Sequence, residues 1–295
     1  MSSLREDGLG GHARDVAIGE RFEFGKNWSH FLAVLDEERI VKAEQSLRLM
    51  LEVKDFCGKR FLDVGSGSGL FSLAARRLGA QVYSFDYDPY SVACTNELKR
   101  RYFPDDDHWI ITEGSVLDQA FLDRLGPFDI VYAWGVLHHT GAMWQALENA
   151  SRMVAEHGKL FIAIYNDQDG ASRRWLIVKR LYNWLPNAGR FVVLGPALVR
   201  LWGVTVLRDL FLGNPFRTWS NYKRERGMSP WRDVVDWVGG YPFEVARPEE
   251  IFEFFKSKGL VLGKFKTCGG GHGCNEFVFE RRSNSCLPSH ASQHS

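Results

Sequence analysis

The sequence has few of the features that mark secreted, membrane-spanning or disulfide-linked proteins. Its five cysteines among 295 residues are scattered without a paired C-x-x-C motif, which predicts a reduced, intracellular chain. The first residues lack the apolar core of a signal peptide. No run of about twenty apolar residues is free of charge, which predicts that no segment spans a membrane. We therefore expect a cytoplasmic protein.

An excess of charge of either sign is also missing. Lys and Arg number 37 and Asp and Glu number 36, for a formal net charge of +1. This balance gives no global attraction to nucleic acid or to a membrane. No repeat recurs at a fixed period. Hydrophobic residues at 45% and charged residues at 25% are ordinary values for a globular protein, and this length suffices for a large core.

The most informative stretch is residues 60–71, Arg-Phe-Leu-Asp-Val-Gly-Ser-Gly-Ser-Gly-Leu-Phe. An apolar run ends at Asp63, Gly65, Gly67 and Gly69 follow, and a helical apolar pattern starts at the next residue. This order predicts a strand, a tight turn and a helix N-terminus, which brings backbone N–H groups close to a ligand. Glycine is required where a ligand approaches the backbone or φ is positive. The third glycine stands one place too early for the pyrophosphate-binding G-x-G-x-x-G pattern.

Strand and helix patterns alternate after this turn. We expect an amphipathic helix before it, at residues 36–51, and another at 146–154. Further strands are predicted at 81–86 and 159–167, at 109–118 together with the loop that follows the strand, and at the start of 128–140. Alternation of this kind, with a topological switch at the first strand, predicts an α/β fold of the Rossmann type with helices on both faces of a parallel sheet.

Polar side chains stand where these strands end. Asp86 is the last residue of the second strand, which puts a carboxylate beside the glycine turn. There it is suited to accept hydrogen bonds from the two hydroxyls of a ribose. The alternative is that it only caps a turn or helix. His138 and His139 follow the fourth strand, and Tyr165 ends the fifth. The carboxyl ends of parallel strands meet at one edge of the sheet, so we expect these residues to share a site.

The stretches Leu-Asp-Val-Gly-Ser-Gly-Ser-Gly, Phe-Asp-Tyr-Asp-Pro and Trp-Gly-Val-Leu-His-His-Thr-Gly together resemble the motifs of class I S-adenosylmethionine-dependent methyltransferases. The nearest branch is that of the quinone-biosynthesis O-methyltransferases. The resemblance covers about residues 55–282 and implies S-adenosyl-L-methionine as cofactor. It also implies a seven-stranded, mostly parallel sheet, closed by an antiparallel pair at 261–266 and 276–280. Ser115 stands where the family often has an acid.

The resemblance implies a set of cofactor contacts along these strand ends. We expect them at Asp63, Gly65, Ser66, Gly67, Gly69, Asp86, Tyr87, Ser115, Val116 and Trp134. Contacts with the methyl acceptor are expected at Trp28, Asn166, Trp219, Tyr222, Tyr241 and His272. An aromatic cluster that includes Trp28 precedes the first helix, and it either covers the cofactor, whose sulfonium favours π faces, or caps the core.

The chain divides into three parts in this interpretation. Residues 1–20 are expected to be a flexible N-terminus, 21–282 the methyltransferase domain and 283–295 a disordered tail. Residues 171–245 form a helical insertion between strands five and six. It holds six of the ten tryptophans, with 12 Lys and Arg against 5 Asp and Glu. We interpret it as a cover for an anionic or lipophilic small-molecule acceptor, with a helical buttress as the alternative.

One segment of the insertion is apolar, from Phe191 to Leu212, and is interrupted by Arg200 and Arg208. This pattern is consistent with contact at a membrane surface, with a lipophilic acceptor, or with a protein core. Cys268, His272 and Cys274 lie within one hairpin and lack a fourth ligand, so we expect no metal site.

A hydroxyl acceptor requires removal of its proton, and histidine is the usual base near neutral pH. His139 is the first candidate, His138 the second, and Tyr165 is expected to orient the acceptor. The alternative is that both histidines only cap strand and helix. The predicted reaction is an in-line methyl transfer to a hydroxyl or carboxyl oxygen.

Three other functions compete with this interpretation. RNA methylation is favoured by the basic, tryptophan-rich insertion and disfavoured by the near-zero net charge. A nicotinamide-dependent oxidoreductase is disfavoured by the early third glycine. A non-catalytic cofactor-binding protein is disfavoured by the polar residues after strands four and five. No Asn/Asp-Pro-Pro-Tyr/Phe run follows strand four, which disfavours methylation of an adenine or glutamine nitrogen.

Overall fold

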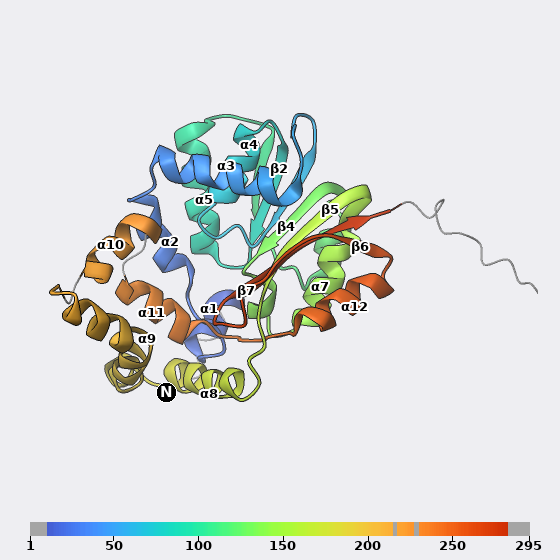
Figure 1. The fold of residues 1–295 in the computed structure, drawn as a ribbon. Coiled ribbons are helices and arrows are strands. Elements are labelled where there is room, and N and C mark those ends of the chain that lie inside the picture. The colour runs from blue at the N-terminus through green and yellow to red at the C-terminus, as the bar shows by residue number, and fades with distance from the viewer. Residues whose placement is uncertain (1–10, 215–216, 227–229, 283–295) are drawn as a thin grey trace, which may run out of the picture.

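The computed structural model describes residues 11–214, 217–226 and 230–282, and a seven-stranded sheet forms its centre (Figure 1). The strands are β1 (Arg60–Val64), β2 (Gln81–Asp86), β3 (Trp109–Glu113), β4 (Phe128–Trp134), β5 (Val154–Tyr165), β6 (Leu260–Lys266) and β7 (Cys274–Arg281). Their order in the sheet is β3-β2-β1-β4-β5-β7-β6. Strands β1 to β5 pair in parallel, and β7 runs antiparallel to both β5 and β6. The predicted α/β fold and its antiparallel closing pair are confirmed.

The strand order creates a switch point at β1. The chain moves outward through β2 and β3 on one side and through β4 and β5 on the other. Asp63 near the end of β1 is paired in register with Ser84 of β2 and Tyr132 of β4. Ligands bind outside the carboxyl ends of parallel strands at such a point, so this register gathers the strand-end residues around one site.

Helices cover both faces of the sheet. They are α1 (Gly11–Ala17), α2 (Gly25–Leu32), α3 (Glu37–Leu51), α4 (Leu70–Arg77), α5 (Pro89–Tyr102), α6 (Gln119–Asp123), α7 (Met143–Arg152), α8 (Gly170–Trp184), α9 (Phe191–Phe211), α10 (Arg217–Arg226), α11 (Pro230–Gly239) and α12 (Pro248–Ser257). Short 3-10 turns lie at Leu137–His139 and Asn187–Gly189. Residues of α3, α4 and α5 pack on one face, and residues of α6, α7 and α12 pack on the other.

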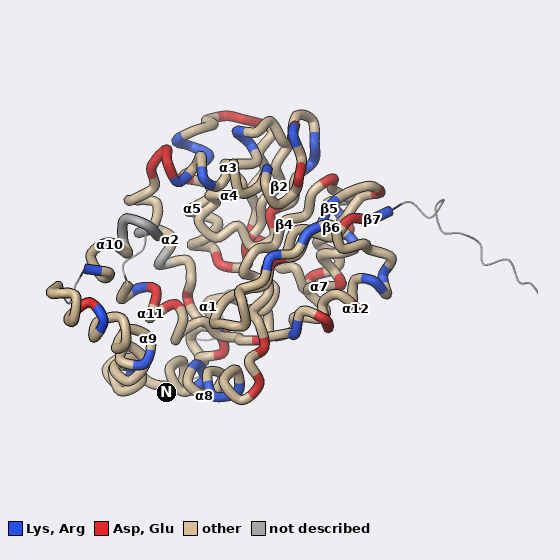
Figure 2. Tube along the Cα trace, viewed as in Figure 1, with Lys and Arg blue, Asp and Glu red and all other residues tan. Residues whose placement is uncertain are grey.

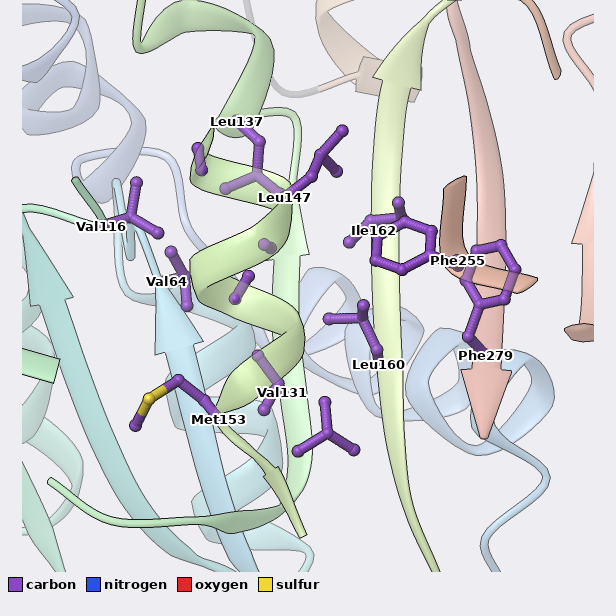
Figure 3. Packing of buried hydrophobic residues seen from close by; sticks show 14 of the residues in the cluster. Val64, Val116, Val131, Leu137, Leu147, Met153, Leu160, Ile162, Phe255 and Phe279 are labelled. Atoms are coloured by element: carbon purple, nitrogen blue, oxygen red, sulfur yellow. The ribbon is translucent and has the colours of Figure 1, made fainter. Parts of the chain in front are cut away.

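The central strands are buried from both sides, which explains their nearly continuous apolar sequence. Figure 3 shows the second face, where α7, which carries Leu147, lies over β4 and β5, which carry Val131, Leu160 and Ile162. Each of these side chains is fully buried. Burial of one such side chain contributes about 1.5–3 kcal/mol relative to exposure, so this layer holds the strand ends firmly in place.

Aspartate side chains cap the starts of two helices. Asp88 accepts a hydrogen bond from the Tyr90 backbone N–H at 2.9 Å and caps α5. Asp118 accepts one from the Phe121 N–H at 3.0 Å and caps α6. These carboxylates satisfy N–H groups that have no partner inside the helix.

Several boundaries differ from the prediction. Strand β5 begins at Val154, before the predicted residue 159, because Val154 pairs with Phe128 across an irregularity in the ladder. Consequently α7 ends at Arg152, and the predicted helix end at Val154 is wrong. The sequence interpretation did not include α12.

The insertion is helical, as predicted, and lies between β5 and β6. Helices α8 to α11 occupy residues 170–239 and gather at one end of the sheet (Figure 1). They share a third apolar cluster, to which Tyr182, Trp202 and Val238 contribute together with Phe22 of the N-terminal segment. The insertion is therefore packed on the domain through its own core.

The N-terminal segment differs from the prediction of a flexible stretch over 1–20. Helix α1 begins at Gly11, and His12 on it is buried. Its ring lies edge-on to Tyr87 at 5.6 Å between centroids, and its Nε2 lies 3.6 Å from Asp88 Oδ2. These contacts with residues beyond the end of β2 order the segment. Residues 1–10 and the predicted tail at 283–295 lie outside the described residues.

The segment Asn187–Phe211, which contains α9, is long and apolar enough to cross a membrane by length and composition. The prediction that no segment spans a membrane rested on Arg200 and Arg208, which interrupt the apolar run. Only 17% of its most apolar 18-residue stretch is buried. The buried part, which includes Leu194 and Trp202, packs against the insertion core. The helix is therefore attached to the domain along one face.

Candidate active site

A cavity of about 1380 Å³ lies at the carboxyl ends of β1, β2, β4 and β5. The glycine turn and the strand ends line one side, and residues of α1, α9, α11 and the hairpin between β6 and β7 line the other. Small-molecule pockets usually measure about 300–1,000 Å³. The cavity therefore has room for a cofactor and a second molecule beside it.

The glycine turn has the backbone that its sequence requires. Gly65, Gly67 and Gly69 have φ values of +74°, +55° and +80°, a region that side-chain-bearing residues rarely adopt. A Cβ on Gly65 would lie 2.4 Å from the Val136 side chain, and one on Gly69 would lie 2.9 Å from the Thr95 Cα. Neighbouring protein atoms thus exclude a side chain at these two positions.

Two buried acids flank the turn. Asp63 accepts a short hydrogen bond from the Ser72 hydroxyl, and burial raises its pKa to about 7. Asp86 accepts a hydrogen bond from the Gly67 N–H to Oδ2 and one from the Asp88 N–H to Oδ1, each at 2.9 Å. Burial raises the pKa of Asp86 to about 6, while these hydrogen bonds oppose the shift. The turn and the end of β2 are thereby joined, as predicted from the spacing.

Nine of the ten predicted cofactor residues line the cavity, and they are Asp63, Gly65, Ser66, Gly67, Asp86, Tyr87, Ser115, Val116 and Trp134. Gly69 is the exception, because it faces Thr95 of α5. The Val116 carbonyl accepts a hydrogen bond from Asn149 Nδ2 at 2.9 Å, which fixes the loop after β3. The Tyr87 hydroxyl donates to Asp15 at 3.2 Å. The predicted set is therefore brought together at one end of the cavity.

His139 lines the cavity at the end of the short turn after β4. Its Nδ1 lies 2.6 Å from the Pro242 carbonyl oxygen. Because a carbonyl oxygen only accepts hydrogen bonds, Nδ1 carries the proton and Nε2 keeps its lone pair. Burial lowers the pKa of His139 to about 3, the charges of Lys179 and Arg21 act in the same direction, and the Pro242 bond opposes them. The imidazole is therefore neutral at pH 7.

The other two predicted catalytic residues have different surroundings. His138 is fully buried, its ring lies 3.9 Å from that of Tyr165, and it is not among the cavity-lining residues. Burial lowers its pKa well below the ordinary histidine value. Tyr165 lines the cavity, and burial raises the pKa of its phenol, so that it remains protonated. Of the three, His139 alone both lines the cavity and carries a basic nitrogen lone pair.

Three of the six predicted acceptor contacts line the cavity, namely Trp28, Tyr222 and His272. The Tyr222 hydroxyl donates to Asp233 Oδ2 at 2.5 Å, which fixes it on the insertion side. The Trp28 ring lies 3.2 Å from the position of a Cβ on Gly67. Trp28 therefore covers the glycine turn, at the cofactor end of the cavity.

The other three lie outside the lining. The side-chain oxygen of Asn166 accepts a hydrogen bond from Asn275 Nδ2 at 2.9 Å, which links β5 to β7. Trp219 packs on Trp202 at 5.0 Å between ring centroids, behind the cavity wall. Tyr241 accepts a hydrogen bond at its backbone carbonyl from the N-terminal segment. These positions support the walls.

The sequence interpretation missed lining residues from two elements. Asp15 comes from the segment predicted to be flexible, and Arg21 is the first residue of the predicted domain. The Arg21 guanidinium lies 4.9 Å from the centroid of the Tyr87 ring. Thr205 of α9 and Asp236 of α11 come from the insertion. The polar composition of the N-terminal segment does not indicate which of its side chains face the cavity. The helical periodicity of the insertion does not indicate it either.

Cysteine and histidine residues near the β6–β7 hairpin form no metal-binding group. Within the described ranges, no three His, Cys, Asp or Glu side chains lie close enough together to hold a metal ion. Cys268 and Cys274 are free thiols that line the cavity, and burial raises the pKa of Cys274 to about 12. The Cys274 thiol is thus a protonated part of the wall.

Comparison with known proteins identifies the class that this fold and site define. The model of a family described as methyltransferase domain matches residues 35–202, more than half of the chain. The chain belongs to this family. It is a class I S-adenosylmethionine-dependent methyltransferase, and S-adenosyl-L-methionine is its cofactor.

Individual relatives match over shorter stretches. The ubiquinone biosynthesis O-methyltransferase of Xanthomonas oryzae is 30% identical over 38% of this chain and 45% of its own length. The ribosomal protein L11 methyltransferase of Bacillus cytotoxicus is 29% identical over 50% of this chain and 49% of its own. The chain thus spans about half the length of these curated relatives.

A solved structure with a similar fold is an O-methyltransferase family protein from Burkholderia thailandensis. Its TM-score is 0.51 at 12% identity, over 83% of this chain and 57% of that one. At this identity, the likeness concerns the fold alone.

The residues around the turn fit the cofactor. S-adenosylmethionine carries positive charge on its sulfonium and amino groups and has two ribose hydroxyls, and Asp63 and Asp86 offer carboxylates close to the turn. The Tyr132 hydroxyl lines the cavity and is buried without a hydrogen-bond partner in the described part of the chain. The Trp28 ring supplies a π face for a cation. A ligand with polar and cationic groups would satisfy these atoms.

Proposed function

We propose that this enzyme methylates a hydroxyl oxygen of a small lipophilic molecule, with His139 as the base. The observation that carries the proposal is the neutral His139 ring, held by Pro242 through Nδ1 at the cavity wall. The cofactor supplies an electrophilic methyl group when bound. The chain then has to orient the acceptor, exclude water and remove one proton.

The low pKa of His139 is compatible with this role. A neutral hydroxyl becomes strongly acidic as its oxygen forms the new bond to carbon, so a weak base suffices when the proton leaves during that step. In the proposed step the acceptor oxygen would bond to the methyl carbon as the carbon–sulfur bond of the sulfonium breaks, and the demethylated cofactor would leave as a neutral thioether. The hydroxyl proton moves to His139 Nε2, and the Pro242 carbonyl stabilises the imidazolium through Nδ1–H. A carboxylate acceptor would have no proton to lose and would make the base dispensable. Hydroxyl is therefore the favoured acceptor.

The lining of the cavity favours an apolar acceptor over an anionic one. Aromatic rings of Phe22, Phe24, Tyr165, Trp202 and Trp237 line the end that the insertion covers. The acids Asp233 and Asp236 also lie there, and they would repel an anion. The name of the Xanthomonas relative, a ubiquinone biosynthesis O-methyltransferase, agrees with an acceptor that combines a ring hydroxyl with apolar groups. We also propose that the reaction takes place in the cytoplasm, consistent with the free thiols of Cys57 and Cys94.

The test compares His139→Ala with a control, His108→Ala. His108 is exposed and directly precedes β3, so it lies at the amino end of that strand, away from the carboxyl ends that line the cavity. Methyl transfer from the cofactor is measured against panels of phenolic, carboxylic and lipid acceptors, and cofactor affinity is measured by calorimetry. We expect His139→Ala to lower turnover about 100-fold or more while cofactor affinity and the control change less than about threefold. Turnover within about threefold of wild type would contradict the base assignment.

The relative named for ribosomal protein L11 provides the competing acceptor, a protein. Wild-type enzyme that methylates a ribosomal protein and none of the small molecules would overturn the acceptor class. Binding of the cofactor without turnover on any acceptor would favour a non-catalytic role.

A further inference from the structure

Helices α8 and α9 expose an unusual amount of apolar surface. On α9 the exposed side chains are Val192, Val199, Val204, Leu207, Leu210 and Phe211, with Val204 at 77% and Phe211 at 89% exposure. On α8 they are Ile177, Leu181 and Trp184, the last at 77%. We call these nine residues the outer face. Water-exposed apolar patches of this extent usually mark an interaction site.

The spacing of the outer face shows that it is one continuous stripe on each helix. Ile177, Leu181 and Trp184 are four and three residues apart on α8. Val199, Val204 and Leu207 are five and three residues apart on α9, which spreads them over a wider arc that still covers one side of the helix. The opposite side of α9, which includes Leu194 and Trp202, is buried in the insertion core. Helix α9 is therefore apolar on both sides, although only one side is covered by protein.

Charge around the outer face is almost entirely positive. Residues 170–214 contain six Arg, one Lys that is buried (Lys179), and one acid, Asp209. Asp209 is buried and accepts a hydrogen bond from the Thr218 N–H at 2.7 Å. Arg173, Arg174 and Arg180 are exposed on α8 between the apolar residues. Figure 2 shows Lys and Arg positions along this helix and long stretches without charged residues along α9. A partner that complements this surface is apolar inside and negatively charged at its boundary.

We propose that the outer face docks on the surface of an anionic lipid bilayer, with α9 lying in the plane of the interface. Exposed Trp and Phe side chains enter the boundary between headgroups and acyl chains, and arginines reach the lipid phosphates with their long stems. Two copies of the chain meeting through this face would bring the two sets of arginines together without compensating acids, so lipid complements it better than a second copy does.

Docking in the plane is favoured over a transmembrane orientation. Leu201, Trp202 and Thr205 of α9 line the cavity, so the helix would have to leave the active site in order to span a bilayer. Arg200 near its middle lies on the exposed side, where it can reach a headgroup but not the hydrocarbon centre. The same helix thus separates the cavity from the proposed membrane surface. This provides a short route for a lipid-soluble acceptor, a consequence that rests on the proposed function.

The test is sedimentation of the full chain with vesicles, made either of phosphatidylcholine alone or of phosphatidylcholine with one third phosphatidylglycerol. We expect binding to the anionic vesicles and at least tenfold weaker binding to the neutral ones, with a decrease at high salt. The double variants Leu207→Ser/Phe211→Ser and Arg173→Glu/Arg180→Glu should each lose at least tenfold in vesicle affinity. Matched controls, Leu49→Ser/Ile110→Ser and Lys54→Glu/Arg124→Glu, change exposed residues elsewhere and should bind like wild type.

Cofactor calorimetry and circular dichroism show whether each variant folds. If Leu207→Ser/Phe211→Ser does not fold, the single variant Val204→Ser is used in its place. Absence of wild-type binding to anionic vesicles would overturn the proposal, as would unchanged binding by folded outer-face variants. A wild-type dimer in sedimentation velocity that Leu207→Ser/Phe211→Ser dissociates would assign the surface to a second copy instead. Vesicle binding requires no turnover, so His139→Ala should bind normally, and a failed base assignment would leave docking intact.

Discussion

Replacement of Lys179 by Met tests the electrostatics beneath the active site. Lys179 of α8 is fully buried, its ammonium donates a hydrogen bond to the Trp237 carbonyl, and it lies 4.6 and 4.7 Å from the centroids of the Trp237 and Phe243 rings. Burial lowers its pKa to about 7, and the charge of Asp236 opposes this shift. The unfolded chain has an ordinary lysine pKa of about 10.4.

The sign of the pH effect follows from these two values. Below pH 7 both states bind the proton, and between about pH 7 and 10 the unfolded state binds more protons than the folded state. The free energy of unfolding therefore rises with pH across this window, with a slope of up to about 1.4 kcal/mol per pH unit. From pH 7 to 9, Lys179 should add roughly 2 kcal/mol to the stability of the wild type, and a methionine at this position adds nothing.

The measurement is urea denaturation of wild type, Lys179→Met and the exposed control Lys54→Met at pH 7, 8 and 9. Methionine leaves the Trp237 carbonyl without its donor, at a cost of about 1–3 kcal/mol that does not depend on pH. The stability difference between wild type and Lys179→Met should thus shift by roughly 2 kcal/mol in favour of wild type from pH 7 to 9. A shift below about 0.5 kcal/mol would show that the buried ammonium keeps an ordinary pKa, and the reasoning would fail.

Two further substitutions test the glycine turn and its acid. Gly69→Ala and Gly270→Ala both place a side chain at positive φ, +80° and +76°, but only the first brings a Cβ within 2.9 Å of a backbone atom, whereas the second meets nothing within 4 Å. Both variants bear the left-handed backbone cost of about 1–2 kcal/mol, so only the clash at Gly69 should separate them. Urea denaturation should show Gly69→Ala to be less stable than Gly270→Ala by more than about 1 kcal/mol. Equal losses of stability would contradict the packing argument. For Asp86, whose pKa is about 6, calorimetry should show cofactor affinity falling as pH drops from 7 to 5, and Asp86→Asn should bind at least tenfold more weakly at pH 7. A wild-type affinity that is flat over this range would argue against a ribose-binding carboxylate.

The sheet was predictable because its information is local. Apolar runs that end in Asp63, Asp86 or paired histidines give each strand and its direction, and the alternation with helices gives the parallel order. The boundaries of β5 and α7 were less predictable, since Val154 belongs to a strand through its pairing with Phe128. That pairing depends on a partner 26 residues away and leaves no local pattern.

The cofactor end of the cavity was predictable for the same reason, since its residues follow strands directly. The acceptor end was less so. His138 and His139 are neighbours with the same chemistry, yet only His139 lines the cavity, because a 3-10 turn at Leu137–His139 directs their rings differently. Whether Trp219 or Trp202 faces the cavity depends on how α9 and α10 pack together. Helical periodicity predicts which side chains share one side of a helix, but it does not predict what that side packs against.

The position of α9 connects the two proposals physically. Its inner side contributes Leu201, Trp202 and Thr205 to the cavity, and its outer side exposes Val199, Val204 and Leu207 to solvent. The helix therefore lies between the cavity and the proposed membrane surface. Lipid that covers its outer side would stabilise its position, and with it the wall of the active site. If both proposals hold, anionic vesicles should increase turnover of a lipid-soluble acceptor more than that of a water-soluble analogue, and the outer-face variants should remove this difference while His139 and the cofactor end remain intact.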